Sequence, residues 1–323
     1  MLMPGVAQKG GLWTGLGVVE LGGYWPVLAP RTIRLYTYEQ IPWHLKGNPY
    51  ITDGYRAFLP SRLCIKSLWV MSNDSGNIWS HLLGFCLFLG FAVYDGIFVL
   101  PSVQASLNDH IIHGLFLFCF QVCMLFSTGF HLFCAHRSER VVRRWLSIDH
   151  AGIAFGMLGC FLPAIYFGFY CHPFWHRVYL LMVLGFTGAI FVLTLHPSFH
   201  SPLGSRLPPS SPMALFVSLG LVGLVLAAHW VILSGGLEAP IVQEFLPRLA
   251  VMYIMAGLAL LLFSCKFPEC YFPGWLNVVG SSHQCWHLIV VLMFSWWHQA
   301  VLCFIRSFAP FGCHGPHPSD HPA

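Results

Sequence analysis

The feature that most constrains this chain is a succession of seven long apolar segments. Each holds about 20 to 25 residues, the length that an α-helix needs to cross the hydrocarbon core of a membrane. Only 9% of the 323 residues are charged, whereas soluble domains average about 25%. We therefore predict an all-α membrane protein with a seven-transmembrane helix bundle. The predicted spans cover residues 78–100, 111–135, 146–170, 177–196, 213–233, 248–267 and 285–306.

The distribution of Lys and Arg predicts how this bundle sits in the membrane. Of the 16 Lys and Arg residues, all but Arg177, Arg248 and Arg306 fall before the first span or in connections on the same side. Because cytosolic segments carry the excess of basic residues, the N-terminus should be cytosolic. Seven spans then place the C-terminus in the lumen.

Three regions follow from this organisation. Residues 1–72 form a cytosolic N-terminal arm, residues 73–306 form the transmembrane domain, and residues 307–323 form a lumenal tail. Basic and aromatic residues near a span suit the headgroup layer, so residues 58–70 are predicted to form a helix on the membrane surface. A loosely ordered arm is the alternative. No basic run is interleaved with exposed aromatics, and no nucleic-acid partner is expected.

Polar residues in the predicted spans can be sorted by their expected depth in the membrane, counted from the cytosolic side. His283 and His287 stand four apart, on one face of a helix, at the start of the seventh span. Ser127 and His131 end the second span, and Asp149 begins the third, so all five lie at the same cytosolic-side depth. Ionisable groups inside a membrane are costly and indicate function. His229 and His298, by contrast, are predicted to make interhelical hydrogen bonds or to lie at the far interface.

These five residues have the chemistry of a zinc site. Three neutral imidazoles, from His131, His283 and His287, are suitable ligands, with a water molecule in the open position. Zinc lowers the pKa of its water to about 7, so Asp149 would hold or deprotonate that water. Ser127 would bond the water or a developing oxyanion. In a second arrangement Asp149 ligates zinc directly and the site is structural.

Four motifs in a fixed order carry a family resemblance. They are NIWSHLLGF at 77–85, SxxxH at 127–131, Asp149 followed by AGI, and SHQxxH at 282–287. Together they resemble the progestin and adipoQ receptor family, which includes the adiponectin receptors. The resemblance implies seven spans, a cytosolic N-terminus and zinc held by the same three histidines, with Asp149 and Ser127 near its water. The interval from His131 to Asp149 is one residue longer than in adiponectin receptors.

Runs in the arm narrow the resemblance. They read YWPVL at 24–28, IRLYTYEQIP at 33–42 and NPYITDGYR at 48–56. This branch of the family implies a multi-pass Golgi membrane protein whose arm binds Raf kinase and damps Raf–MEK–ERK signalling. The resemblance to adiponectin receptors implies an alternative, a zinc-dependent lipid amide hydrolase of the ceramidase type. A lipid or hormone receptor is the third reading. Whether the chain is an enzyme stays open at this point.

Overall fold

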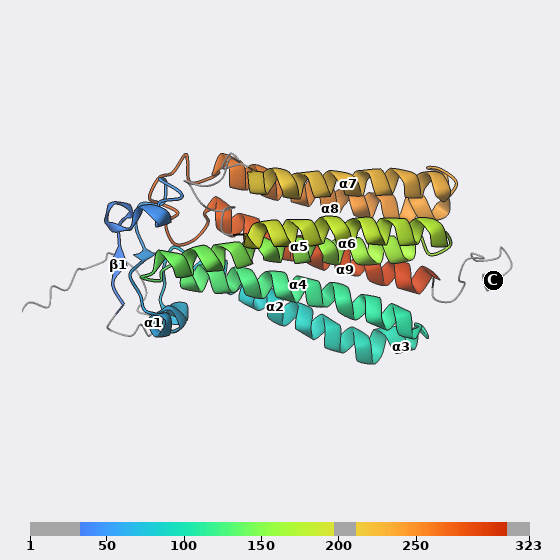
Figure 1. Cartoon of the computed structure of the whole chain (residues 1–323), viewed down its shortest axis with the longest axis horizontal. Coiled ribbons are helices and arrows are strands. Elements are labelled where there is room, and N and C mark those ends of the chain that lie inside the picture. The colour runs from blue at the N-terminus through green and yellow to red at the C-terminus, as the bar shows by residue number, and fades with distance from the viewer. Residues whose placement is uncertain (1–32, 197–210, 309–323) are drawn as a thin grey trace, which may run out of the picture.

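In the computed structural model, seven long helices lie side by side along the long axis of the molecule (Figure 1). The structure describes residues 33–196 and 211–308. All seven helices are long and apolar enough to cross a membrane, so the predicted seven-helix architecture is confirmed. They are α2 (Ser75–Tyr94), α4 (Leu107–Phe133), α5 (Glu139–Gly168), α6 (Pro173–Leu195), α7 (Ser211–Leu233), α8 (Pro240–Cys265) and α9 (Ser282–Phe308).

Two helices begin well before the predicted spans, because hydropathy detects only the apolar part of a helix. The first turns of α5 are polar, and Arg143 donates to Glu139 one turn earlier, with Nε 2.8 Å from Oε1. Such pairs stabilise exposed helical turns. Helix α8 begins at Pro240, and proline is favoured at the first helical position, where its missing N–H costs nothing.

The first span changes its helical type near its end. Helix α2 is followed by a π-helical turn, η4 (Asp95–Val99), and by the short helix α3 (Leu100–Ser102). Ser106 and Asp109 then form a capping box that begins α4. The π-helical turn places the Asp95 side chain inside the bundle, where it is 2% exposed.

The described part of the N-terminal arm is folded. Strand β1 (Leu35–Tyr36) pairs antiparallel with β2 (Tyr55–Arg56). The remaining elements are the turns η1 (Tyr38–Gln40), η2 (Trp43–Leu45) and η3 (Ser67–Trp69), and the helix α1 (Ser61–Lys66). Within residues 58–70, α1 and η3 form a short helical segment; its position on a membrane surface stays a prediction.

Hydrogen bonds fasten this arm to one end of the bundle. The Leu59 amide donates to the Ala135 carbonyl at 2.9 Å, just beyond α4. The Thr52 amide donates to Asn277 Oδ1 at 2.8 Å, in the connection between α8 and α9. The arm therefore closes the end of the bundle at which α4 ends and α9 begins (Figure 1).

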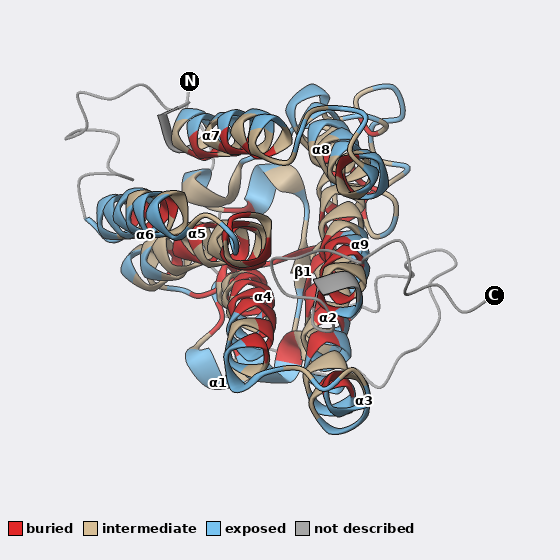
Figure 2. Ribbon diagram, turned by 90° about the vertical axis from the view of Figure 1, so that its right-hand side faces the viewer, coloured by how far each residue is buried: buried red, intermediate tan, exposed pale blue. Residues whose placement is uncertain are grey.

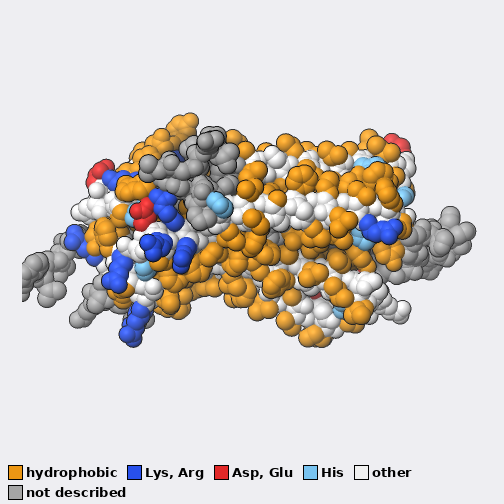
Figure 3. Space-filling view, in the orientation of Figure 1, with side chains coloured by type: hydrophobic (Ala, Val, Ile, Leu, Met, Phe, Trp, Pro, Cys, Tyr) orange, Lys and Arg blue, Asp and Glu red, His pale blue; other side chains and the backbone are white. Residues whose placement is uncertain are grey.

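The buried residues lie on the faces that the helices turn toward one another (Figure 2). Helices α2, α4 and α9 share an aromatic layer, in which Phe120 and Phe294 stack with ring centroids 3.9 Å apart and Phe88 packs against both. Figure 3 shows an apolar middle with Lys and Arg gathered at the arm end. Such a surface suits a bilayer that covers the middle of the bundle.

Candidate metal centre

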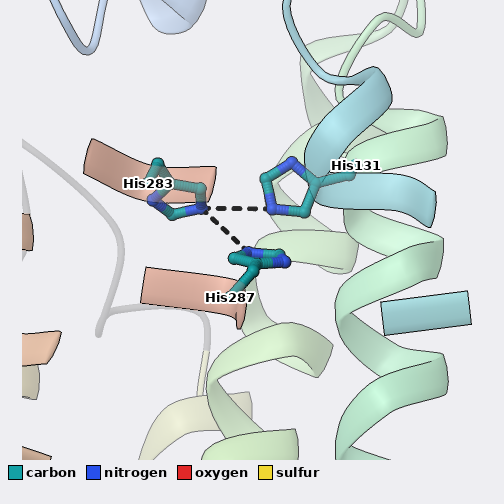
Figure 4. Close-up of side chains that lie close together, drawn as sticks. All are labelled: His131, His283 and His287. Atoms are coloured by element: carbon teal, nitrogen blue, oxygen red, sulfur yellow. Dashed lines mark hydrogen bonds between the residues drawn. The ribbon is translucent and has the colours of Figure 1, made fainter. Parts of the chain in front are cut away.

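Three histidines converge at the arm end of the bundle (Figure 4). His131 lies near the end of α4, and His283 and His287 lie on the first turns of α9. His283 Nε2 is 3.2 Å from His131 Nε2 and 3.2 Å from His287 Nε2. His131 and His287 are 4% and 2% exposed. The structure thus brings together the three predicted metal ligands, which the spacing of the sequence alone could not establish.

The hydrogen bonds of the outer ring nitrogens decide where the protons lie. His131 Nδ1 is 3.0 Å from Asp74 Oδ1, and His287 Nδ1 is 3.1 Å from the Asn77 carbonyl oxygen. Both partners accept hydrogen bonds, and a neutral imidazole has only one N–H. The two Nδ1 atoms therefore carry the protons, and both Nε2 atoms present lone pairs to the centre.

This donor set fits a zinc ion. With two Nε2 atoms as acceptors, only His283 has a proton to offer, and it cannot satisfy both neighbours at once. A cation at the centre satisfies all three lone pairs. Ligands of a tetrahedral zinc with bonds of about 2.0–2.1 Å stand about 3.3 Å apart, close to the 3.2 Å separations in the structure. The contacts at Nδ1 orient the ligands as the outer partners of zinc-bound histidines do.

Asp74 and Arg56 complete the surroundings of His131, and sequence reasoning missed both. Arg56 is 2% exposed; its Nη2 donates to the His131 carbonyl at 2.7 Å and lies 3.5 Å from Asp74 Oδ2. Burial opposes the ionisation of Asp74, but its hydrogen bond with His131 and the charge of Arg56 hold its pKa below the ordinary value. Asp74 immediately precedes α2 and lies four residues before the predicted first span, so an argument limited to polar residues inside the spans did not include it.

The start of α9 is held by a buried acid. Glu269 is 0% exposed, and its Oε2 accepts from the Ser282 amide at 2.7 Å. Its Oε1 accepts from Asn48 Nδ2 at 2.9 Å and from the Ser282 hydroxyl. Because carboxylates at a helix N-terminus satisfy free N–H groups, Glu269 fixes the first turn of α9 and with it His283. One acid thus joins the arm to the metal centre.

Ser127 and Asp149 lie beside this centre, on the wall of a large cavity. Their side chains interact with each other, and the Asp149 carboxyl is close enough to His131 to interact electrostatically. The cavity has a volume of about 830 Å³ and an almost wholly apolar lining from α5, α7, α8 and α9, while His283 and His287 border it. All five predicted site residues therefore meet at one place, with an apolar chamber beside them.

His81 is a further polar residue of this chamber. Its ring stacks on that of His287 with centroids 3.7 Å apart, and it is 3% exposed. The signal in the sequence was its position in the first turns of the first span, at the depth of the ligands. The stacking restricts the orientation of the His287 ring.

Comparison with known proteins places this arrangement in a family. Residues 69–298 match the haemolysin-III related family. The mouse protein named progestin and adipoQ receptor family member 3 is 55% identical over 286 residues, which cover 88% of this chain and 91% of the mouse protein. This chain belongs to the progestin and adipoQ receptor family. The human protein of the same name is 54% identical, again over 88% of this chain and 91% of that protein.

A plant protein is similar over most of the chain. Heptahelical transmembrane protein 1 of Arabidopsis thaliana is 32% identical over 86% of this chain and 83% of its own length. The family and the multi-pass membrane architecture that the sequence predicted are confirmed.

Proposed function

We propose that this chain is a Golgi membrane protein whose N-terminal arm binds Raf kinase and lowers Raf–MEK–ERK signalling. The observation that carries the proposal is that similarity to progestin and adipoQ receptor family member 3 extends into the arm. Residues 69–323 supply at most 255 of the 286 matched positions. The other matched positions lie before residue 69, in the part of the arm that precedes the haemolysin-III related match.

The arm has a surface that suits a protein partner. Trp43 is 63% exposed, and the guanidinium of Arg143 lies 5.7 Å from its ring centroid. Exposed aromatic and Arg side chains are the commonest anchors of protein interfaces. Trp43 belongs to the folded arm and Arg143 to α5, so a partner would meet a preformed surface where the arm lies against the bundle.

The orientation in the membrane is part of the same proposal. Of the 13 Lys and Arg residues in the described parts of the chain, ten lie at the arm end, which supports a cytosolic arm. Cys171, between α5 and α6 at the opposite end, is disulfide-bonded. Because disulfides persist in oxidising compartments, this supports a lumenal position for that end.

The test uses single surface substitutions in the full chain. Deleting the arm would also remove Arg56 from the metal centre, so its effect would be ambiguous. We expect the wild type to draw Raf kinase to the Golgi in cells and to co-precipitate with it. Trp43→Ala should weaken both, whereas Trp275→Ala, 86% exposed at the same end, should not. Equal capture by all three proteins would contradict the proposal.

A second function has its own observation. The cavity of about 830 Å³ places an apolar chamber beside Asp149, Ser127 and the three histidines, which favours a zinc-dependent lipid amide hydrolase. His131, His283 and His287 would hold the zinc, which when bound supplies an activated water. Asp149 would take the proton of that water, and Ser127 would orient the Asp149 carboxyl. The apolar wall would hold the acyl chains.

Hydrolysis of a short-chain ceramide by purified protein tests this second function. Asp149→Asn should abolish hydrolysis while the metal content stays unchanged, because Asp149 is assigned to proton transfer and not to ligation. Cys160→Ser, on the same cavity wall, should keep the activity. If the wild type binds metal and does not cleave the amide, the centre is a structural link between α4 and α9.

A further inference from the structure

A second group of metal-ligating side chains lies inside the bundle, on the two helices that carry the first and on the turn that follows α2. Asp95 belongs to the π-helical turn after α2, His113 to α4 and His298 to α9. One ligand atom from each lies within 4.8 Å of the others. His298 follows His287 by 11 residues, which places it about 16 Å further along α9.

All three residues are inaccessible to solvent. Asp95, His113 and His298 are 2%, 1% and 1% exposed. A buried carboxylate requires a positive charge or hydrogen-bond donors close by. Within residues 33–196 and 211–308, the ion-pair partners of Asp95 are His113 and His298 alone. A group that combines one carboxylate with two imidazoles therefore attracts a cation.

The contacts inside the group leave one ligand atom without a hydrogen bond. Asp95 Oδ2 is 2.6 Å from His298 Nε2, as in a hydrogen bond. His113 Nε2 is 3.2 Å from the same oxygen but is buried and makes no hydrogen bond. Buried polar atoms rarely lack one. An imidazole nitrogen beside a carboxylate that makes no hydrogen bond is free to ligate a cation.

The surroundings hold these side chains as the outer contacts of a metal site do. Gln299 Nε2 lies 3.3 Å from His298 Nδ1. The His298 ring also stacks on Phe91, with centroids 4.3 Å apart and planes 6° apart. The carboxylate is supplied by a π-helical turn, and such turns occur frequently at functional sites. These contacts fix the His298 ring and the backbone that carries Asp95.

We propose that Asp95, His113 and His298 form a second binding site for a divalent transition metal of the zinc type. Two imidazoles and one carboxylate are a donor set that zinc accepts. Metal binding would replace the hydrogen bond between Asp95 and His298, because zinc ligands stand about 3.3 Å apart. The site would join α2, α4 and α9 at the end opposite the arm.

Metal content of purified full-length protein, grown with zinc, tests this site. The measurement is made in a His283→Ala background, in which the first centre lacks one ligand. The wild type should hold about two zinc ions per chain and His283→Ala about one. His283→Ala/His113→Gln should hold none. The control His283→Ala/His110→Ala changes a half-buried histidine of the same helix that lies outside the group and should keep one.

Cobalt spectroscopy of the single variant His283→Ala gives a test that does not depend on whether the double variant folds. Cobalt-loaded His283→Ala should show the visible d–d absorption of a four-coordinate nitrogen and oxygen site. If folded His283→Ala holds no zinc and gives no such bands, Asp95 and the two histidines share only a proton and the proposal is overturned. That result would leave the first centre intact. Equal metal content in wild type and His283→Ala would instead count against the first centre.

Discussion

The two histidine groups share helices α4 and α9 and differ in what they lack. At the arm end, His131, His283 and His287 present three nitrogens to one another, and the Asp74 carboxylate bonds the outside of the group. At the far end, the Asp95 carboxylate stands between His113 and His298. A bound cation would offset the shortage of hydrogen-bond donors in the first group and the buried negative charge in the second.

This difference shows that two buried histidine groups can favour a cation for different reasons. In the first group the reason is the bonding of the outer nitrogens, which commits the protons of His131 and His287 to Nδ1. Between the two groups lies the aromatic layer of Phe88, Phe120 and Phe294. The three-helix core is thus polar at both ends and apolar between them, and each polar end fixes the helices in one register.

Loss of Arg56 should lower the stability of the protein more than the other substitutions described below. Arg56→Ala leaves the buried Asp74 without its guanidinium and the His131 carbonyl without its donor. Removing one partner of a buried ion pair costs about 3–5 kcal/mol. Thermal unfolding in detergent should show a correspondingly large fall in Tm, with Arg62→Ala, exposed on α1, as the control. Equal melting of the two variants would show that the arm is not fastened through Arg56.

Asp74→Ala measures how much the outer hydrogen bond of His131 contributes to metal affinity while the three ligands stay in place. All three histidines remain, but His131 loses the acceptor of its Nδ1 proton. Outer partners of this kind contribute about 10–100-fold to metal affinity. Competition with a zinc chelator should show that loss, and Glu39→Ala, whose side chain is 85% exposed, should not. Unchanged affinity in Asp74→Ala would mean that Asp74 only pairs with Arg56.

Gly84 tests the close packing of α2 in the apolar region between the two groups, and its substitution should change stability least. A Cβ on Gly84 would lie 3.0 Å from Met124 Sδ and 3.0 Å from Val291 Cγ2. Because the end of a Met side chain can move, Gly84→Ala should cost about 1 kcal/mol. Gly90 on the same helix has nothing within 4 Å, so Gly90→Ala should stabilise by up to about 1 kcal/mol. Calorimetry that ranks them in the reverse order would contradict the close packing of α2.

Much of this account was predictable from the sequence, for reasons that particular residues make clear. The seven helices could be predicted because an apolar run of about 20 residues is long enough to cross the membrane as a helix. The convergence of His131 with His283 and His287 follows from helical spacing and a common depth. The folded arm did not follow, because the bonds of Leu59 and Thr52 join it to residues far along the chain.

The contacts that surround the three histidines, and the second polar group, could not be predicted from the sequence for a different reason. Arg56 lies 75 residues before His131, and nothing in its neighbourhood distinguishes it from the exposed arginines of the arm. Asp95, His113 and His298 each stand alone in a separate helix, so no spacing pairs them. Interhelical hydrogen bonding was the correct prediction for His298, which bonds Asp95, and for His229, whose Nδ1 lies 2.5 Å from Tyr179 Oη.

The central claim is that His131, His283 and His287 hold one metal ion. Elemental analysis of purified wild type beside His283→Ala measures it most directly, with Trp43→Ala as a variant outside both groups. The account predicts that His283→Ala loses one equivalent of zinc per chain while Trp43→Ala loses none. Identical zinc content in wild type and in folded His283→Ala would contradict it, and would leave the convergence of the three histidines without its proposed cause.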